Sequence, residues 1–337
     1  MKKRKFIYAL LAGLAFTACS NEDQAVQQPQ KQSHPLTIEV TENPLIQDGA
    51  EGSNSNRAAI TTGSTLTSFK LDYVYTKNEM VKTNGEGFAY SVTNTSGTWS
   101  TSGIWPEDAI GSTLEDDLTV NWYSYTKGTF YENGGNPYVS FSTDEQTANQ
   151  HDLLVAKNSG KYHGVNNSLS FGFDHACSAL RLSVKKSTNL DGYTLKVTNI
   201  ALKNVVKVGN YYYNSSSWTP SSNSEYRSNY TLYSGSEITL LSGSTNYVSL
   251  NGNFGTNEAP YLFLIPQELT AWNASTNTTG AYISVTCTII KDATQLYNAE
   301  ARIPFAKTFE KGKSYDVKIN IGKNSLLKTD GTKIINE

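Results

Sequence analysis

Apolar and polar residues alternate along most of this chain, in short segments divided by turns rich in Gly, Ser and Asn. In "SLSFGF", Leu169, Phe171 and Phe173 share one face, and "AYISVTCTII" and "SYDVKINI" repeat the pattern. A period of two residues is that of a β-strand with one buried face. After the first 18 residues, no stretch of ten or more follows the 3.6-residue period of an amphipathic helix. The sequence therefore predicts an all-β fold of antiparallel sandwiches.

The length allows two domains of ordinary size. A Gly/Asn-rich stretch near residues 160–168 predicts the division, which gives sandwiches at 58–165 and 166–337. The buried face changes parity between Phe173 and Leu180, which indicates a bulge or a break at "DHACSA". The Tyr/Ser-rich insert at 209–235 interrupts the alternation and predicts a long surface loop or an exposed hairpin.

The first residues have the parts of a secretory signal peptide, predicted at 1–18. A positive stretch, "KKRK", precedes an apolar run of about ten residues, too short to cross about 30 Å of hydrocarbon as a helix. The run ends on Cys19, and "FTAC" resembles the lipobox of bacterial lipoproteins. The resemblance implies a diacylglyceryl group on the Cys19 sulfur and cleavage between Ala18 and Cys19. An ordinary signal with an incidental cysteine is the alternative. The acidic "SNEDQ" resembles the export signal that sends Bacteroidetes-type lipoproteins to the outer leaflet of the outer membrane.

Residues 19–57 form an unusual segment before the first sandwich. Residues 20–35 are polar and Gln-rich, which is typical of a disordered tether. The next residues, "LTIEV", place Leu36, Ile38 and Val40 on one face and predict a short strand. A second polar segment follows and ends at Arg57. We therefore expect an isolated strand between two flexible segments.

Composition and motifs argue against an enzyme and against a nucleic-acid partner. With 28 basic and 30 acidic residues, the formal net charge of −2 gives no electrostatic footprint for nucleic acid. The motifs H-E-x-x-H and G-x-S-x-G are absent, and "KGKS" at 311–314 lacks the earlier glycine of a phosphate-binding loop. The four histidines lack metal-ligand spacing. The acidic cluster at 115–117 indicates a solvated loop or a calcium-binding loop. We expect no catalytic residue, metal or cofactor.

Two groups of residues leave alternatives open. Cys177 and Cys287 both lie in predicted strands, and an exported protein permits a disulfide between them. Two small buried apolar side chains are the other interpretation. Exposed aromatic residues at 211–213 and Trp218 suit either stacking on sugar rings or packing within their own loop.

Several motifs together resemble the fimbrillin family (Mfa-like) of Bacteroidales, which are pilins and pilin-like lipoproteins. They are "IWPEDAIGSTLEDDLTVNWYSYT", "HDLLVAK", "LSFGFDHACSALRLSV", "YLFLIPQ" and "FEKGKSYDVKINI", in the family's order from about residue 58 to 321. The resemblance implies two tandem transthyretin-like β-sandwich domains. It also implies that an arginine-specific protease cuts between Arg57 and Ala58, removing the lipidated segment with its first strand. A strand donated by another subunit would then fill the exposed groove.

In this family the donor comes from the C-terminal strands. Here "SLLKTDGTKIINE" predicts a short hairpin that carries the candidate donor residues Leu326, Leu327, Ile334 and Ile335 around an Asp-Gly turn. Each arm has only about four residues, which puts a stalk role in doubt and leaves tip, stalk or anchor open. The predicted function is a fimbrial subunit or an accessory or tip protein, with other fimbrial subunits and the outer membrane as partners. A monomeric surface lipoprotein that binds glycan or host ligand through Tyr/Trp-rich loops is the alternative.

Overall fold

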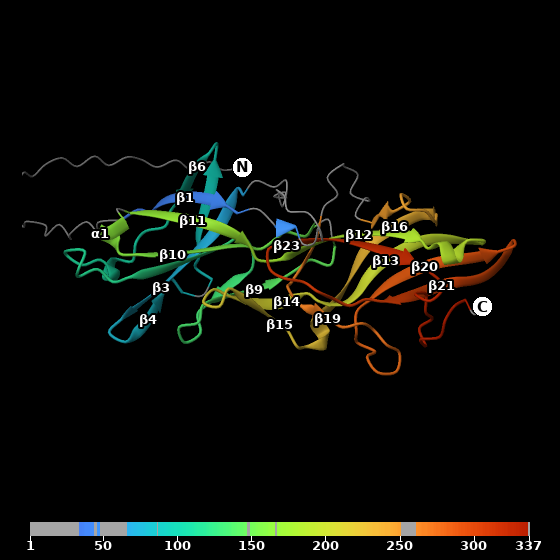
Figure 1. Ribbon diagram of the computed structural model, residues 1–337. Coiled ribbons are helices and arrows are strands. Elements are labelled where there is room, and N and C mark those ends of the chain that lie inside the picture. Colours follow the sequence, from blue (N-terminus) through green and yellow to red (C-terminus); the bar gives the residue numbers. More distant parts are fainter. Residues whose placement is uncertain are drawn as a thin grey trace, which may run out of the picture. The chain divides into compact units, whose positions relative to one another are not determined.

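The computed structural model describes residues 34–43, 46–47, 66–85, 87–146, 149–165, 167–250 and 261–335 (Figure 1). Almost every described element is a strand, which confirms the predicted all-β fold. The described helices are single short turns: α1 (Tyr162–Val165), η1 (Glu107–Ala109), η3 (Thr188–Leu190) and η4 (Ser224–Tyr226). The predicted signal peptide, Cys19 and the Arg57–Ala58 bond lie outside the described residues.

The largest sheet has eight strands and contains the predicted first strand at one end. In spatial order its strands are β1 (Thr37–Glu42), β11 (Ser168–His175), β10 (Leu154–Gly160), β7 (Val120–Tyr125), β3 (Ser68–Lys77), β5 (Tyr90–Thr95) and β6 (Thr98–Thr101), with β4 (Met80–Thr83) paired to β3. Figure 1 shows β1 in blue running alongside β11 in yellow-green. The isolated strand expected from "LTIEV" is therefore part of a sheet.

One face of this sheet surrounds an apolar cluster that we call the N-terminal core. Its members come from strands across the whole sheet and include Phe69, Trp122, Leu169, Phe171 and Phe173. Pro35, just before β1, forms a bridge with Ile104, just after β6. The two ends of the sheet are thus hydrogen-bonded to one another, and the sheet curves around its core.

The opposite face of the same sheet packs against a second sheet of four strands. These are β15 (Ser217–Pro220), β14 (Val208–Tyr212), β9 (Tyr138–Ser142) and β8 (Thr129–Tyr131). Tyr123, Tyr125 and Val155 from the first sheet meet Val139 and Tyr211 from the second in another apolar cluster. The eight-stranded sheet is therefore covered on both faces where these strands lie.

The remaining strands form a sandwich around an apolar cluster that we call the C-terminal core, whose members include Leu182, Val197, Leu202, Ile283 and Val285. One layer holds β17 (Val248–Ser249), β12 (Ser178–Lys186), β23 (Lys313–Ile321) and β2 (Ile46–Gln47), with β18 (Leu262–Leu264) paired to β12. The other holds β16 (Arg227–Leu240), β13 (Tyr193–Val206), β20 (Tyr282–Lys291) and β21 (Thr294–Pro304). The strands β19 (Glu268–Leu269) and β22 (Lys307–Thr308) form a separate two-stranded sheet, and Leu269 is buried in the same core. As the alternation predicts, the face of β20 that carries Ile283, Val285 and Ile289 is buried.

The sheets do not follow the expected division at 165/166. The Gly/Asn-rich stretch near residue 165 contains only the short turn α1, which joins the neighbouring strands β10 and β11. The chain leaves the eight-stranded sheet after His175 and enters the next sheet at Ser178. The predicted parity change at "DHACSA" is therefore a break between two strands of different sheets.

Candidate functional site

The strand β1 is the edge strand of the eight-stranded sheet, and its only strand partner among the described elements is β11. The two strands run parallel, with Ile38 opposite Leu169, Val40 opposite Phe171 and Glu42 opposite Phe173. Antiparallel neighbours can be joined by a tight turn, whereas parallel neighbours are connected through a long stretch of chain. Nothing short in the sequence therefore ties β1 to the strand beside it.

Alternate side chains of β1 enter the N-terminal core. Leu36 and Ile38 are only 8% and 6% exposed, and Val40 packs against the same cluster from a half-buried position. Beneath them lie Phe171 and Phe173, which are fully buried. Burying a Leu or Ile side chain contributes about 1.5–3 kcal/mol. Because β1 is short and lies at an edge, a few buried side chains provide most of the free energy that holds it to the sheet.

Hydrogen bonds hold the start of β1 to the far end of the sheet. The Leu36 backbone N–H donates to the carbonyl of Gly103 at 3.2 Å, and the Trp105 N–H donates to the carbonyl of His34 at 2.9 Å. The His34 ring contacts the Tyr162 hydroxyl at 2.9 Å. Residues 34–36 therefore close the gap between the two ends of the curved sheet.

The end of β1 is held by polar side chains on β11. The Asn43 amide donates to the Asp174 carboxylate at 2.8 Å, and the Asn43 backbone N–H donates to the Phe173 carbonyl at 2.8 Å. Glu42 Oε1 lies 3.8 Å from Nε2 of His175. These contacts were not predicted from the sequence, where "DHACSA" indicated only a bulge or a break.

The segment after β1 reaches the C-terminal sandwich. Ile46 and Gln47 form β2, which pairs in parallel with Lys313 and Ser314 of β23. The strand β2 has no signal in the sequence, because two residues are too few to show a period. One stretch of chain, residues 34–47, therefore provides edge strands to two different sheets.

His175 and Asp152 form a buried polar pair beneath the end of β1. His175 Nδ1 lies 2.5 Å from Oδ2 of Asp152, whose Oδ1 accepts the backbone N–H of Cys177 at 3.2 Å. The side chains of the two residues are only 3% and 7% exposed. The pair joins Asp152, two residues before β10, to His175, the last residue of β11, at the point where the chain changes sheet.

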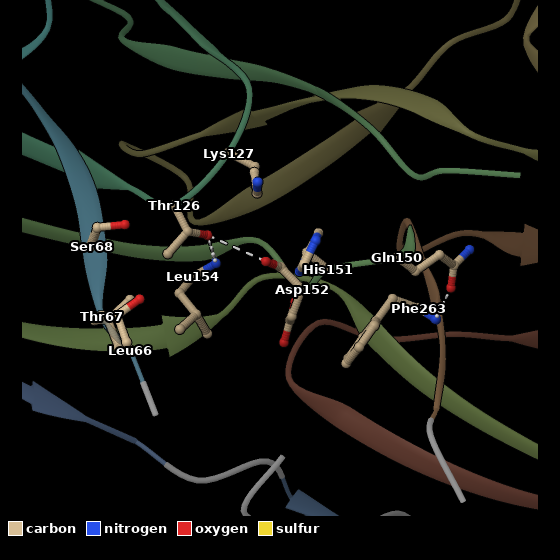
Figure 2. Close-up of a pocket in the computed structure, with 10 residues that line it drawn as sticks. All are labelled: Leu66, Thr67, Ser68, Thr126, Lys127, Gln150, His151, Asp152, Leu154 and Phe263. Atoms are coloured by element: carbon tan, nitrogen blue, oxygen red, sulfur yellow. Dashed lines mark hydrogen bonds between the residues drawn. The ribbon is translucent and has the colours of Figure 1, made fainter. Parts of the chain in front are cut away.

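A hollow of about 430 Å³ lies beside this pair. Figure 2 shows Asp152 and His151 in its wall, with Leu66 and Leu154 on one side and Phe263 of β18 on another. The Asp152 carboxylate already has two hydrogen-bond partners, so it is not an unoccupied base. Among the described residues, no group of three His, Cys, Asp or Glu side chains is arranged to hold a metal ion.

The acidic cluster at 115–117 is only partly a solvated loop. Glu115 and Asp116 are exposed, whereas Asp117 is buried. Its carboxylate accepts the backbone N–H groups of Gly111 at 2.9 Å and His163 at 2.8 Å. Asp117 therefore fastens one loop to α1.

Both internal cysteines are free and buried. Cys177 lies in the apolar cluster between the eight-stranded sheet and the sheet that contains β14, and Cys287 lies in the C-terminal core. Burial raises the pKa of the Cys177 thiol, and burial also raises the pKa of Cys287 to about 12. The structure thus agrees with two small buried side chains and not with a disulfide.

The aromatic insert is a packing element. The expected loop or exposed hairpin is the hairpin β14–β15, and β14 pairs along its other edge with β9. Tyr211 and Tyr213 are 3% and 2% exposed, and the Trp218 indole N–H donates to the Ala176 carbonyl at 2.6 Å. These rings join segments from both halves of the sequence. Tyr211 and Tyr213 are therefore not available to stack on sugars.

The C-terminal residues fold back onto their own sandwich as the predicted short hairpin. Leu327 exchanges backbone hydrogen bonds with Arg302 and forms a bridge with Lys333. Leu326 and Ile335 are 0% and 5% exposed in the C-terminal core, and Ile334 packs against that core. The candidate donor residues are thus already part of the C-terminal sandwich.

Fold and site together define a class of protein. It is built of packed β-sheets, and its first described strand, β1, pairs with a strand that lies far from it in sequence, β11. None of the described helices is long and apolar enough to span a membrane. The chain belongs to the fimbrillin-like family, whose model matches residues 57–334. The description of the family supports a fimbrial role for the chain.

Solved structures that match this chain come from Bacteroides and Parabacteroides species. A fimbrial protein from Bacteroides vulgatus is 15% identical, with a TM-score of 0.49 over 85% of this chain and 95% of the other. A protein assigned to cell adhesion from Parabacteroides distasonis is 9% identical, with a TM-score of 0.48 over 89% and 91%. Another from Bacteroides eggerthii is 13% identical, with a TM-score of 0.46 over 91% and 93%. The chain matches none of the curated proteins with which it was compared.

Proposed function

We propose that this chain is a fimbrial subunit or accessory protein that accepts a donated strand after its lipidated N-terminal segment is removed. Cleavage between Arg57 and Ala58 would separate residues 34–47 from the rest of the chain. The polar residues before Arg57 suit a protease, which needs an extended segment in its cleft. The lipid on Cys19 would hold the precursor at the outer membrane until then.

The observation that carries this proposal is the position of β1. Its departure would uncover Phe171 and Phe173 and leave the outer edge of β11 without a partner, because β1 now covers both. An unpaired edge above an apolar core is a template for a foreign strand. A donor with three alternate apolar side chains would restore the burial that Leu36, Ile38 and Val40 now provide.

The C-terminal hairpin supports an accessory position over a stalk position. A stalk subunit must both accept and donate a strand. Using residues 326–335 as a donor would expose Leu326 and Ile335, at a cost of about 1.5–3 kcal/mol for each side chain. We therefore propose that this chain accepts a strand more readily than it donates one, so that cleaved copies assemble with one another slowly.

Limited proteolysis of the purified full-length precursor tests the proposal. We expect an arginine-specific protease to cut after Arg57 and convert a monomer into SDS-resistant multimers. Arg57→Lys keeps the charge but removes the cleavage site, so this matched variant should stay monomeric. Cleaved wild-type protein that remains monomeric would contradict the strand-exchange mechanism.

A further inference from the structure

The four-stranded sheet β15–β14–β9–β8 has one face that is open to solvent and carries no charge. Its other face packs on the eight-stranded sheet (Figure 1). Because side chains alternate along a strand, the residues between the packed ones point outward. On all four strands these outward side chains are exposed or half-buried, and none of them is charged. They are three tyrosines, Val208, Asn210 and the hydroxyl-bearing side chains of Ser and Thr.

The three tyrosines form a row across this open face. Tyr131 of β8 lies opposite Tyr138 of β9, and Tyr138 lies opposite Tyr212 of β14. Their ring centroids are 5.3 Å apart in the first pair and 5.1 Å apart in the second. Rings at these distances are offset and overlap only in part, so each keeps some of its negative face open. Tyr211 and Tyr213, on either side of Tyr212 in sequence, point the other way and are buried.

A hollow of about 260 Å³ lies at the Tyr131 end of the row. Tyr131 and Glu132 line it together with Val81 and Thr83 of β4. It is smaller than the pockets of about 300–1,000 Å³ that enclose drug-sized ligands, so it has room for one ring of a longer molecule. Glu132 is the only charged residue among the described residues that line it. Oε1 of Glu132 accepts the backbone N–H of Gly135, which holds the carboxylate in place and leaves Oε2 to accept from a ligand.

This surface suits a neutral oligosaccharide better than a protein. A stable protein interface covers about 800 Å² on each partner and has an apolar centre. Val208, by contrast, is the only aliphatic side chain on the open face of these strands. A sugar presents C–H groups, which the negative face of a tyrosine ring attracts, and hydroxyl groups, which need hydrogen-bond partners. The Asn210 amide, beside Tyr212 on the same face of β14, has no hydrogen-bond partner among the described residues and can supply one.

We propose that Tyr131, Tyr138 and Tyr212 form the platform of a binding site for a linear neutral oligosaccharide, one ring of which enters the hollow beside Glu132. The carboxylate accepts hydrogen bonds from sugar hydroxyl groups and repels acidic sugars. None of these residues belongs to β1 or β11, so the site stands apart from the strand-exchange mechanism. It would give the chain a direct contact with a glycan-coated surface.

Isothermal titration calorimetry of the full, uncleaved chain tests the site. The probes are cellohexaose, mannohexaose and galactohexaose, each beside the uronate made by oxidising its primary hydroxyl groups. We expect at least one neutral hexasaccharide to bind, and its uronate to bind at least about tenfold more weakly because Glu132 repels the added carboxylates. If none of the neutral probes binds, or if a uronate binds as tightly as its neutral parent, the proposal is overturned.

Substitutions locate the bound sugar on the row. Tyr131→Ala and Tyr212→Ala should each weaken binding of the neutral probe about two- to tenfold, the range of one aromatic contact. Glu132→Gln keeps the shape of the side chain and should reduce the discrimination against the uronate. Tyr226→Ala removes a tyrosine that is 41% exposed on η4, away from the open face, and should leave the affinity unchanged. Thermal unfolding checks that each variant is folded.

The outcomes separate this site from other surfaces and from the proposed function. Affinities that are the same in wild type, Tyr131→Ala and Tyr212→Ala would place the sugar elsewhere and overturn the proposal. Because these measurements use uncleaved chain, they do not depend on a cut at Arg57. Binding that the two tyrosine substitutions weaken supports the site even if cleaved subunits never form multimers, and multimers formed by a chain that binds no sugar reject only the site.

Discussion

Gly103 shows how closely the start of β1 approaches the far end of the sheet. A Cβ atom at this position would lie 3.0 Å from Cδ1 of Leu36 and 3.1 Å from the Tyr90 ring. Both distances are shorter than ordinary contacts between carbon atoms. Leu36 is buried and its backbone is hydrogen-bonded to Gly103 itself, so neither partner has room to move away.

We therefore expect Gly103→Ala to destabilise the protein by about 1–3 kcal/mol through overpacking. Urea denaturation measures the effect. Gly172→Ala is a matched control on β11, where the added Cβ would lie 3.6 Å from Thr41 Oγ1 in ordinary contact. That variant should be neutral or slightly stabilising. Equal losses in both variants would show that Gly103 is not needed for the approach of Leu36.

Asp117 is a second residue whose role depends on its buried position. Burial alone would raise the pKa of Asp117, but hydrogen bonds from the His163 and Gly111 backbone N–H groups, together with the His163 ring, outweigh burial and lower it. A lowered folded-state pKa contributes stability that is present above the unfolded pKa of about 3.9 and is lost as the pH falls through the folded value.

Asp117→Asn should therefore cost about 1–3 kcal/mol near neutral pH, where the carboxylate has two backbone donors to satisfy. The difference from wild type should shrink below about pH 3.9, as the wild-type carboxylate also loses its charge. Denaturant unfolding at both pH values measures this, with exposed Glu115→Gln as the control. A difference that is the same at both pH values would show that the charge of Asp117 has no part in stability.

At the scale of elements, the sequence predicts individual strands better than their partners. The faces of β20 and β11 follow from alternation, because burial on one side is a local property of a strand. The parallel pairing of β1 with β11 has no local signal, since the two strands are far apart in sequence. In β3 the alternation predicts one buried face, which carries Phe69 and Leu71. Asp72 and Val74 on the other face are also buried.

The burial of the second face of β3 has no signal in the sequence near β3, because the residues that pack against this face come from much later in the chain. Val74 shares its apolar cluster with Tyr211 and Tyr213, which lie at the end of β14 and just beyond it, more than 130 residues later in the chain. Asp72 is satisfied within the same layer by the Tyr125 hydroxyl at 2.8 Å, and burial raises its pKa. A single sequence cannot indicate that a distant hairpin will pack there.

The indole N–H of Trp218 fastens this hairpin to the break between β11 and β12. Trp218→Phe keeps an aromatic ring against Tyr211 and Phe141 but leaves the buried Ala176 carbonyl without its 2.6 Å donor. We expect a loss of about 1–3 kcal/mol, the cost of an unpaired buried polar group. Thermal unfolding measures it, and Tyr212→Phe on the same hairpin is the control. A loss no greater than that of the control would show that packing alone holds the hairpin.

At the scale of the whole molecule, residues 34–47 join two sheets that the rest of the chain builds separately. β1 completes the sheet around the N-terminal core, and β2 covers the edge of β23 in the C-terminal sandwich. On the proposed mechanism, a donated strand takes the place of β1 and must present apolar side chains with the same parity. A shift by one residue would turn every apolar side chain away from the core.

A peptide with the sequence of residues 34–43 should therefore compete with the natural donor. Added in excess during cleavage at Arg57, it should suppress the formation of multimers, as measured by SDS gel electrophoresis. A control peptide replaces Leu36, Ile38 and Val40 with serine, so that no shift in register restores the apolar face. With about 1.5–3 kcal/mol lost for each buried apolar side chain, it should bind at least roughly tenfold more weakly. Equal inhibition by both peptides would mean that binding in the groove does not depend on the alternating apolar side chains of β1. Assembly would then need a surface other than the edge of β11.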